Sequence, residues 1–192
     1  RGAFSMRVRR GFRDMLDGTA NTIMMGEIAT DLGDRDIRTM GMQGPTEPRF
    51  NPTVCRPSAD PLRPQFWGMA VPAAMLFAAN QGRGFRWASA DTAYSVCATI
   101  LPPNREFCVR SVTRPIITEG TSTMSSRHQG GAHVLMGDGA IRFITDSIEA
   151  GNSNMASVAL DNAAFPTGAR SPYGLWGSLG TRAAKETITV EF

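Results

Sequence analysis

One histidine in the C-terminal half of the chain lies near side chains that could do nucleophilic chemistry. The stretch "SSRHQGGAHVLMGDGAIRF" places nine residues between His128 and the pair Asp138-Gly139. A hydroxyl from Ser125 or Ser126 would complete the residue types of a Ser/His/Asp triad. However, the stretch lacks the G-x-S-x-G context of a nucleophile elbow, and serines beside a histidine are common in polar turns. We therefore expect no catalytic residue here and no enzymatic activity.

Metal ligands of the zinc type are sparse in this sequence. The three cysteines, Cys55, Cys97 and Cys108, form no C-x-x-C pair, and the histidines are His128 and His133. Because a structural zinc site needs four ligands, the sequence predicts no such site.

Carboxylates suited to calcium are more frequent near the N-terminus. Five aspartates lie close in sequence, but "DLGDRD" lacks the ordered acidic spacing and final Glu of an EF-hand loop. Calcium is thus the one cofactor that the composition leaves open. The five aspartates are Asp14, Asp17, Asp31, Asp34 and Asp36.

The residues around Asp138 have a simpler explanation in backbone geometry. Alternation in "AHVLM" and "AIRFI", joined by "GDG", predicts a β-hairpin whose Asp-Gly pair adopts the positive φ angles of a type I′ turn. In a regular first strand, His128, Ala132 and Val134 would share one face. We expect His128 to be a scaffold residue, partly or wholly buried. Its hydrogen bond should go to the segment after the turn or to the backbone of "DGTANT".

The composition is that of a single domain with many turns. The chain has 192 residues, 42% of them hydrophobic, with 20 Gly and 12 Pro, which argues against a helical bundle. The net charge is only +3. Arginines crowd residues 1–13 but alternate there with apolar side chains, as on a half-exposed strand. We expect no nucleic-acid binding, and no stretch is apolar enough to cross a bilayer.

Periodicity predicts short elements separated by loops. The apolar run 22–28 and the segment "AYSVCATI" are typical of strands, whereas "AAMLFAA" is typical of one or two helical turns. Residues 31–72 are rich in Pro and Gly and should form a long surface excursion. Near the C-terminus, we expect a short helix at 153–160 and a closing strand at 187–192.

Several motifs resemble a large planctomycete family of prepilin-like proteins of unknown function, which is recognised by a C-terminal histidine, nine residues and Asp-Gly. His128 and Asp138-Gly139 match that signature. The motifs occur in family order along nearly the whole chain. They are "LDGTANTIMMGE", "GRGFRWAS", "TILPPN", "SSRHQGGAHVLMGDGAIRFITDSI" and "SPYGLWGSLGTR".

This resemblance implies a fold and a location. Family members begin with a type IV prepilin leader and an apolar helix, so residues 1–192 would be the globular part of a longer precursor. The implied fold is an α+β, pilin-like head with an antiparallel sheet, short helices and long Gly/Pro-rich loops. The chain departs from the family at Gln129, where Pro is usual, and at Cys97, where an aromatic residue is usual.

Two functions of different classes follow. The first is a non-enzymatic, exported subunit of a surface filament or secretion apparatus, which would pack with copies of itself or with other pilin-like subunits. Its only membrane contact would be the missing N-terminal helix. The second is an exported module that binds a small molecule or carbohydrate, with Trp67, Trp87 and Trp176 as stacking residues.

Export also makes a disulfide expected. A link between Cys55 and Cys108 closes a loop of about fifty residues, worth on the order of 3 to 4 kcal/mol in the entropic model. A link between Cys97 and Cys108 would constrain much less chain. We expect the first, with Cys97 as a buried thiol that packs like a small hydrophobe.

Overall fold

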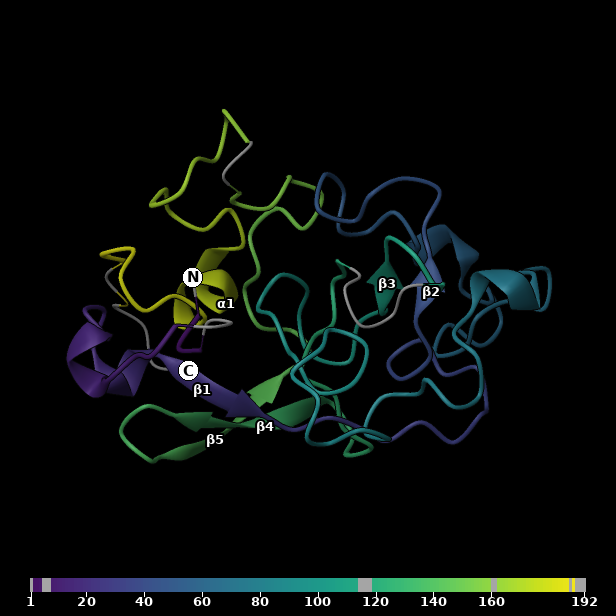
Figure 1. The fold of residues 1–192 in the computed structure, drawn as a ribbon, viewed down its shortest axis with the longest axis horizontal. Helices are drawn as coiled ribbons and strands as arrows, with labels where there is room; N and C mark the ends of the chain where they lie inside the picture. The colour runs from purple at the N-terminus through teal and green to yellow at the C-terminus, as the bar shows by residue number, and fades with distance from the viewer. Residues whose placement is uncertain (1, 5–7, 114–118, 160–161, 187, 189–192) are drawn as a thin grey trace.

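The computed structural model describes residues 2–4, 8–113, 119–159, 162–186 and 188. A three-stranded antiparallel sheet, of order β1-β4-β5, lies at one end of the molecule, and a short parallel pair, β2 and β3, lies toward the other (Figure 1). The antiparallel sheet, short helices and long loops expected for an α+β protein are thus present. In chain order the elements are η1 (Phe12–Asp14), η2 (Thr19–Asn21), β1 (Ile23–Gly26), β2 (Met42–Gln43), η3 (Arg56–Ser58), η4 (Ala73–Met75), β3 (Cys108–Val109), β4 (Gly131–Met136), β5 (Ile141–Thr145) and α1 (Gly174–Leu179), where η marks a 3₁₀ turn.

The β4–β5 hairpin is the most regular part of the fold, as its alternating sequence predicts. Its loop differs from the predicted type I′ turn. Gly139 has φ of 90°, whereas Gly137 and Asp138 have no positive φ. Gly139 donates to the Met136 carbonyl (3.0 Å) and Met136 donates to the Ala140 carbonyl (2.9 Å). This is the pattern of a three-residue loop in which a left-handed glycine follows the turn.

The inner face of the sheet forms the first hydrophobic cluster. Alternation along β4 directs Ala132, Val134 and Met136 inward, where all three are buried. Helix α1 covers this face with Trp176 and Leu179, both fully buried. Helix α1 is not predicted by the sequence pattern, because glycines interrupt its segment.

A second and a third cluster lie around β2 and β3. A disulfide joins Cys55 to Cys108, as predicted, and its buried surroundings include Met42 and Trp67. The expectation that residues 31–72 form a surface excursion is therefore wrong in one respect. Although irregular, this segment contributes buried side chains to a core of its own. The third cluster comprises Phe77, Ala93, Tyr94, Phe107, Val109 and Val112.

Other predicted elements have mixed outcomes. The strand at 22–28 is confirmed as β1, and "AAMLFAA" contains the single turn η4. The segment "AYSVCATI" is no strand, because the N–H groups of Tyr94, Ser95 and Val96 all turn back to the Asp91 carbonyl. The expected helix at 153–160 is absent from its described part, where the Ser157 N–H bonds instead to the Arg49 carbonyl. The predicted closing strand at 187–192 lies outside the described residues, except for residue 188.

No helix in the described part of the chain combines the length and apolarity needed to cross a membrane.

Candidate functional site

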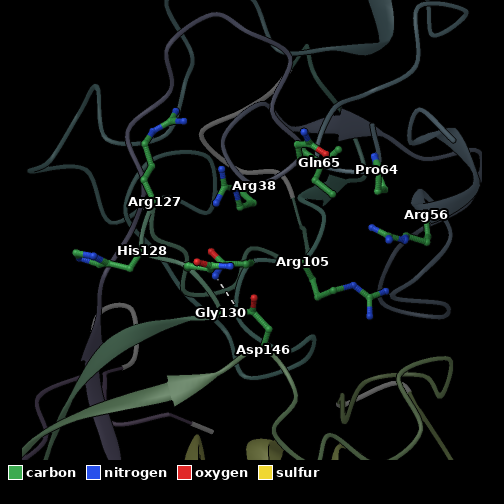
Figure 2. A pocket seen from close by; sticks show the side chains of 12 residues that line it. Arg38, Arg56, Pro64, Gln65, Arg105, Arg127, His128, Gly130 and Asp146 are labelled. Carbon is green, nitrogen blue, oxygen red and sulfur yellow. Dashed lines mark hydrogen bonds between the residues drawn. The ribbon is translucent and has the colours of Figure 1, made fainter. Parts of the chain in front are cut away.

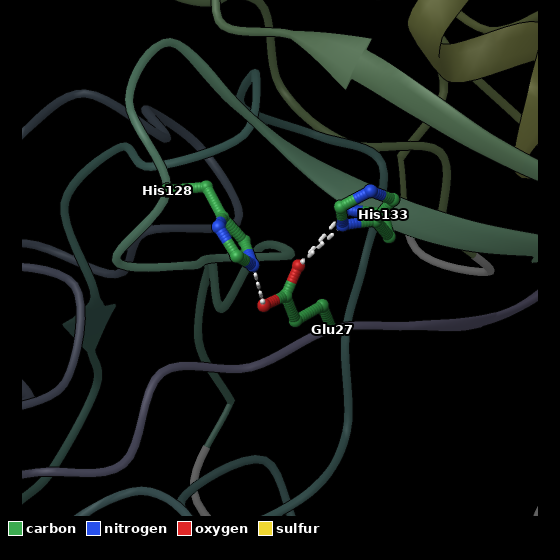
Figure 3. A group of neighbouring side chains, drawn as sticks. All are labelled: Glu27, His128 and His133. Atoms are coloured by element: carbon green, nitrogen blue, oxygen red, sulfur yellow. Dashed lines mark hydrogen bonds and ion pairs between the residues drawn. The ribbon is translucent and has the colours of Figure 1, made fainter.

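Three side chains with metal-ligand chemistry meet on the outer side of the three-stranded sheet. Glu27 directly follows β1, His133 belongs to β4, and His128 lies in the loop before β4. The Glu27 carboxylate stands between the two imidazoles (Figure 3). One carboxylate oxygen lies 3.1 Å from His133 Nδ1 and the other lies 3.3 Å from His128 Nε2. We call these three residues the Glu–His–His cluster.

Strand pairing fixes two members of this cluster. The Glu27 N–H donates to the His133 carbonyl (2.9 Å), and the His133 N–H donates to Glu27 Oε2 (3.1 Å). The β1–β4 pairing therefore extends one residue past β1 and holds the carboxylate beside the His133 ring. The ring of His133 also contacts the edge of Phe143, its cross-strand partner, at a centroid distance of 5.0 Å.

The loop that carries His128 is held by a buried serine. Ser126 Oγ accepts a hydrogen bond from the His128 N–H (3.0 Å) and donates one to the Gly131 carbonyl (2.7 Å). Gly130, with φ of 83°, turns the chain between this loop and β4. His128 is thus not a strand residue, and the expectation that it shares a face with Ala132 and Val134 is wrong.

The burial predicted for His128 is also wrong. Its side chain is 61% exposed, that of His133 is 46% exposed and that of Glu27 is 29% exposed. His128 contacts the carboxylate of Glu27 rather than backbone of "DGTANT" or the segment after the turn. The cluster is therefore open to solvent, and ions or small ligands can reach it.

Electrostatics favour an ionised Glu27. Partial burial acts to raise the pKa of its carboxyl. Hydrogen bonds from the His133 backbone and ring, together with the charges of both imidazoles, outweigh that effect and hold the pKa below its ordinary value.

An apolar row crosses the same outer face, next to the cluster. The strand register aligns Met25 with Leu135 and Leu135 with Ile141. Met25 is 56% exposed, Ile141 is 73% exposed, and Phe143 in the neighbouring row is 41% exposed. The sheet thus buries one face under α1 and presents large apolar side chains on the other.

A pocket of about 440 Å³ opens on the other side of the His128 loop (Figure 2). His128 stands at its rim, with its ring directed away from Arg38 and Arg105. Four arginines line it, and each has an acidic partner: Arg38 pairs with Asp36, Arg127 with Asp34 and Asp36, and both Arg56 and Arg105 with Glu106. Asn104 and Asp146, which are hydrogen-bonded to each other, add further polar groups.

The proposed nucleophiles have structural roles. Ser125 and Ser126 are buried, and Ser125 Oγ accepts a hydrogen bond from the Ala29 N–H (3.1 Å). Asp138 lies in the hairpin loop, where its carboxylate accepts the Ala140 N–H (2.9 Å). The structure does not bring these residues together with the His128 ring as a triad.

The aspartates considered for calcium are each hydrogen-bonded or ion-paired to other groups of the protein. Asp17 binds the N–H groups of Ala184 and Lys185, and the buried Asp31 accepts from the Thr39 hydroxyl. Asp14 caps the N–H of Gly11, Asp34 caps that of Asp36, and Asp36 pairs with Arg38. Within the described residues, the cluster of possible metal ligands is instead Glu27, His128 and His133.

Sequence reasoning missed Glu27. A signal was present, because Glu27 is the one charged residue within the apolar run 22–28 that predicts a strand, and it ends the motif "LDGTANTIMMGE". The residue that pairs with it across the strands, His133, is 106 residues away in the sequence, and this pairing is what forms the site.

The tryptophans considered for ligand stacking divide into two kinds. Trp67 is 1% exposed and donates its indole N–H to the Met40 carbonyl (2.7 Å). Trp176 is fully buried and donates to the Leu101 carbonyl (2.6 Å). These two are core residues without a face free for a ligand. Trp87, in contrast, is 87% exposed.

Fold and site together define a disulfide-linked protein of antiparallel sheet and short helices, with a Glu–His–His cluster on its surface. A family model described as "Protein of unknown function (DUF1559)" matches residues 1–151, and the chain belongs to this family. Searches of curated proteins and of solved structures gave no significant match. The disulfide is compatible with an exported protein.

Proposed function

We propose that this protein is the head of an exported, non-enzymatic, pilin-like subunit of a surface filament or secretion apparatus. In this proposal it packs against copies of itself or against other pilin-like subunits, and an N-terminal helix in the precursor provides its membrane contact. The motifs that resemble a planctomycete prepilin-like family support the proposal.

The observation that carries this proposal is the apolar row on the outer face of the sheet. Met25 and Ile141 lie on either side of Leu135 in this row and are largely exposed, and Phe143 in the neighbouring row is 41% exposed. Exposed apolar patches of this kind mark interaction sites, because burying them against a partner removes apolar surface from water. A subunit that assembles side by side with others needs such a face.

Assembly can be tested with the secreted, full-length protein. We expect surface filaments or higher oligomers in native preparations by electron microscopy and light scattering. Ile141→Asp should reduce assembly strongly, because it places a charge in the apolar row. Leu62→Asp is the matched control, since Leu62 is 90% exposed and lies outside this sheet.

Two outcomes contradict the proposal. One is a native protein that stays monomeric at every concentration, with no filaments on the cells that secrete it. The other is equal assembly of the Ile141→Asp and Leu62→Asp variants, which would separate any oligomer from this face of the sheet.

A second candidate function, an exported small-molecule or carbohydrate-binding module, is favoured by the arginine-lined pocket. Polar groups converge there from the loops at Arg38, Asn104 and Arg127. The buried Trp67 and Trp176 would not take part. A thermal-shift screen with sugars and small carboxylates tests this function, and Arg127→Leu should abolish any stabilisation. Arg63→Leu, which alters an exposed arginine outside the pocket, should not.

A further inference from the structure

We propose that the Glu–His–His cluster binds one divalent transition-metal ion, with Zn²⁺ as the reference ion. This site goes beyond the proposed role as a surface subunit and does not depend on it. The ligands are one carboxylate oxygen of Glu27, Nε2 of His128 and Nδ1 of His133.

The three ligand atoms are already close to a binding arrangement. They all lie within 4.8 Å of one another, and each imidazole nitrogen already contacts one oxygen of the Glu27 carboxylate, His133 Nδ1 at 3.1 Å from Oε2 and His128 Nε2 at 3.3 Å from Oε1. Zinc binds histidine nitrogen and carboxylate oxygen at about 2.0 to 2.2 Å, so ligand atoms of a tetrahedral site stand roughly 3.3 to 3.5 Å apart. A small movement of the exposed His128 side chain would therefore close the site (Figure 3).

The scaffold limits how far the other two ligands can move. A backbone hydrogen bond from the Glu27 N–H to the His133 carbonyl, and one from the His133 N–H to the Glu27 carboxylate, hold Glu27 beside His133, and Phe143 packs against the His133 ring. The two imidazoles meet edge to face, with ring centroids 5.3 Å apart and planes at 87°. Because backbone pairing and ring packing already restrict Glu27 and His133, ordering these two ligands costs little conformational entropy.

The chemical types of the three ligands indicate which class of metal ion the cluster would bind. Two imidazoles and one carboxylate suit zinc and its transition-metal neighbours, whereas calcium and magnesium prefer oxygen ligands alone. Three protein ligands also leave at least one coordination position for water or an external group. Since the side chains are exposed, that position faces solvent and can accept a donor from another molecule.

Isothermal titration with Zn²⁺, on full-length protein without a polyhistidine tag, tests the site directly. We expect one ion per chain. Residues 1–192 contain two histidines, and single substitutions of them therefore assign imidazole binding within this part of the protein. His128→Asn and His133→Asn should each weaken Zn²⁺ binding by at least about tenfold, in line with the losses seen even for groups that only support a metal ligand. Glu27→Gln should weaken it similarly.

Two control variants separate this site from adventitious binding. Asp138→Asn removes an exposed carboxylate from the hairpin loop and should leave Zn²⁺ affinity unchanged. Cys97→Ser removes the free thiol and should also leave it unchanged. Circular dichroism establishes that each variant is folded. His128→Asn is the decisive change, because its largely exposed side chain makes it the variant with the least effect on folding.

Co²⁺ provides a second readout that reports the ligands themselves. Co²⁺ bound by the cluster should give visible absorption bands that Zn²⁺ displaces and that His128→Asn removes. The proposal is overturned if folded wild-type protein binds no Zn²⁺. It is equally overturned if the histidine variants bind as tightly as Asp138→Asn.

Discussion

Two regions of this molecule use their polar groups in opposite ways. In the three-stranded sheet, backbone ladders pair the main chain, and Met25, His133 and Ile141 on the outer face remain accessible to other molecules. Around β2 and β3 the ladder is only two residues long, and buried side chains form some of the hydrogen bonds to the main chain. Regular strand pairing thus leaves the side chains of one sheet face available for function. In the irregular region, by contrast, polar side chains are used to hydrogen-bond the backbone.

Arg83 shows how the irregular region is held. This side chain is fully buried and donates to the Thr92 and Val96 carbonyls, each at 3.1 Å, and to the Cys97 sulfur. Its guanidinium also lies over the ring of Phe107, 5.3 Å from the centroid. The buried carboxylate of Glu106, in contrast, pairs with two side chains, those of Arg105 and Arg56.

The largest expected effect tests the core beneath the sheet. Trp176→Ala should lower the free energy of unfolding by about 3 to 5 kcal/mol, because it opens a large cavity and removes the indole N–H that donates to the Leu101 carbonyl. Chemical denaturation measures the loss. Trp87→Ala is the control and should change stability by less than about 0.5 kcal/mol, since Trp87 is 87% exposed. Equal losses in the two variants would contradict the assignment of Trp176 to the core.

Removing the disulfide should affect the irregular region more than the sheet. The link spans 53 residues, so the double variant Cys55→Ala/Cys108→Ala should lose about 3 to 4 kcal/mol. Hydrogen exchange should rise around β2 and β3 and change less in the β4–β5 hairpin. Uniform loss of protection throughout the chain would show that the two regions do not differ in this way.

The hairpin loop gives an intermediate effect. Gly139→Val should cost about 1 to 3 kcal/mol, because a β-branched residue is strained at φ of 90°. Gly11 is a matched control, since its φ is −119° and a Cβ there meets nothing within 4 Å. Thermal unfolding should therefore separate Gly139→Val clearly from Gly11→Val. A Gly139→Val variant as stable as wild type would exclude the loop geometry described above.

The smallest effect concerns Cys97, the free thiol beside Arg83. Loss of hydration raises the pKa of this thiol, although the Arg83 guanidinium acts to lower it. At about pH 8.5, where a free thiol is half ionised, Cys97 should react more slowly with iodoacetamide in folded than in unfolded protein.

The same shift has a defined sign for stability. Because the folded state holds the thiol proton more tightly, its contribution is present below the ordinary thiol pKa and is lost as the pH rises above it. Cys97→Ser should reduce this dependence of the unfolding free energy on pH. Faster alkylation in the folded protein would contradict the direction of the shift.

Local features of the fold could be read from the sequence with fair success. The β4–β5 hairpin, β1 and the positive φ of Gly139 follow from alternation and turn residues, which act over a few positions. The turn class was missed because "GDG" allows two loop lengths, and the distinction depends on which residues pair across the strands. The Cys55–Cys108 link was predicted from loop entropy, a property of the unfolded chain.

The sequence by itself determined the hairpin, the disulfide and the motifs that relate the chain to its family. Only the tertiary structure decided that residues 31–72 contribute buried side chains, that His128 is exposed, and that Glu27 joins it beside His133. The physical reason is sequence separation. Glu27 reaches His133 through a strand register across 106 residues, and no local periodicity specifies which antiparallel partner a four-residue strand will choose.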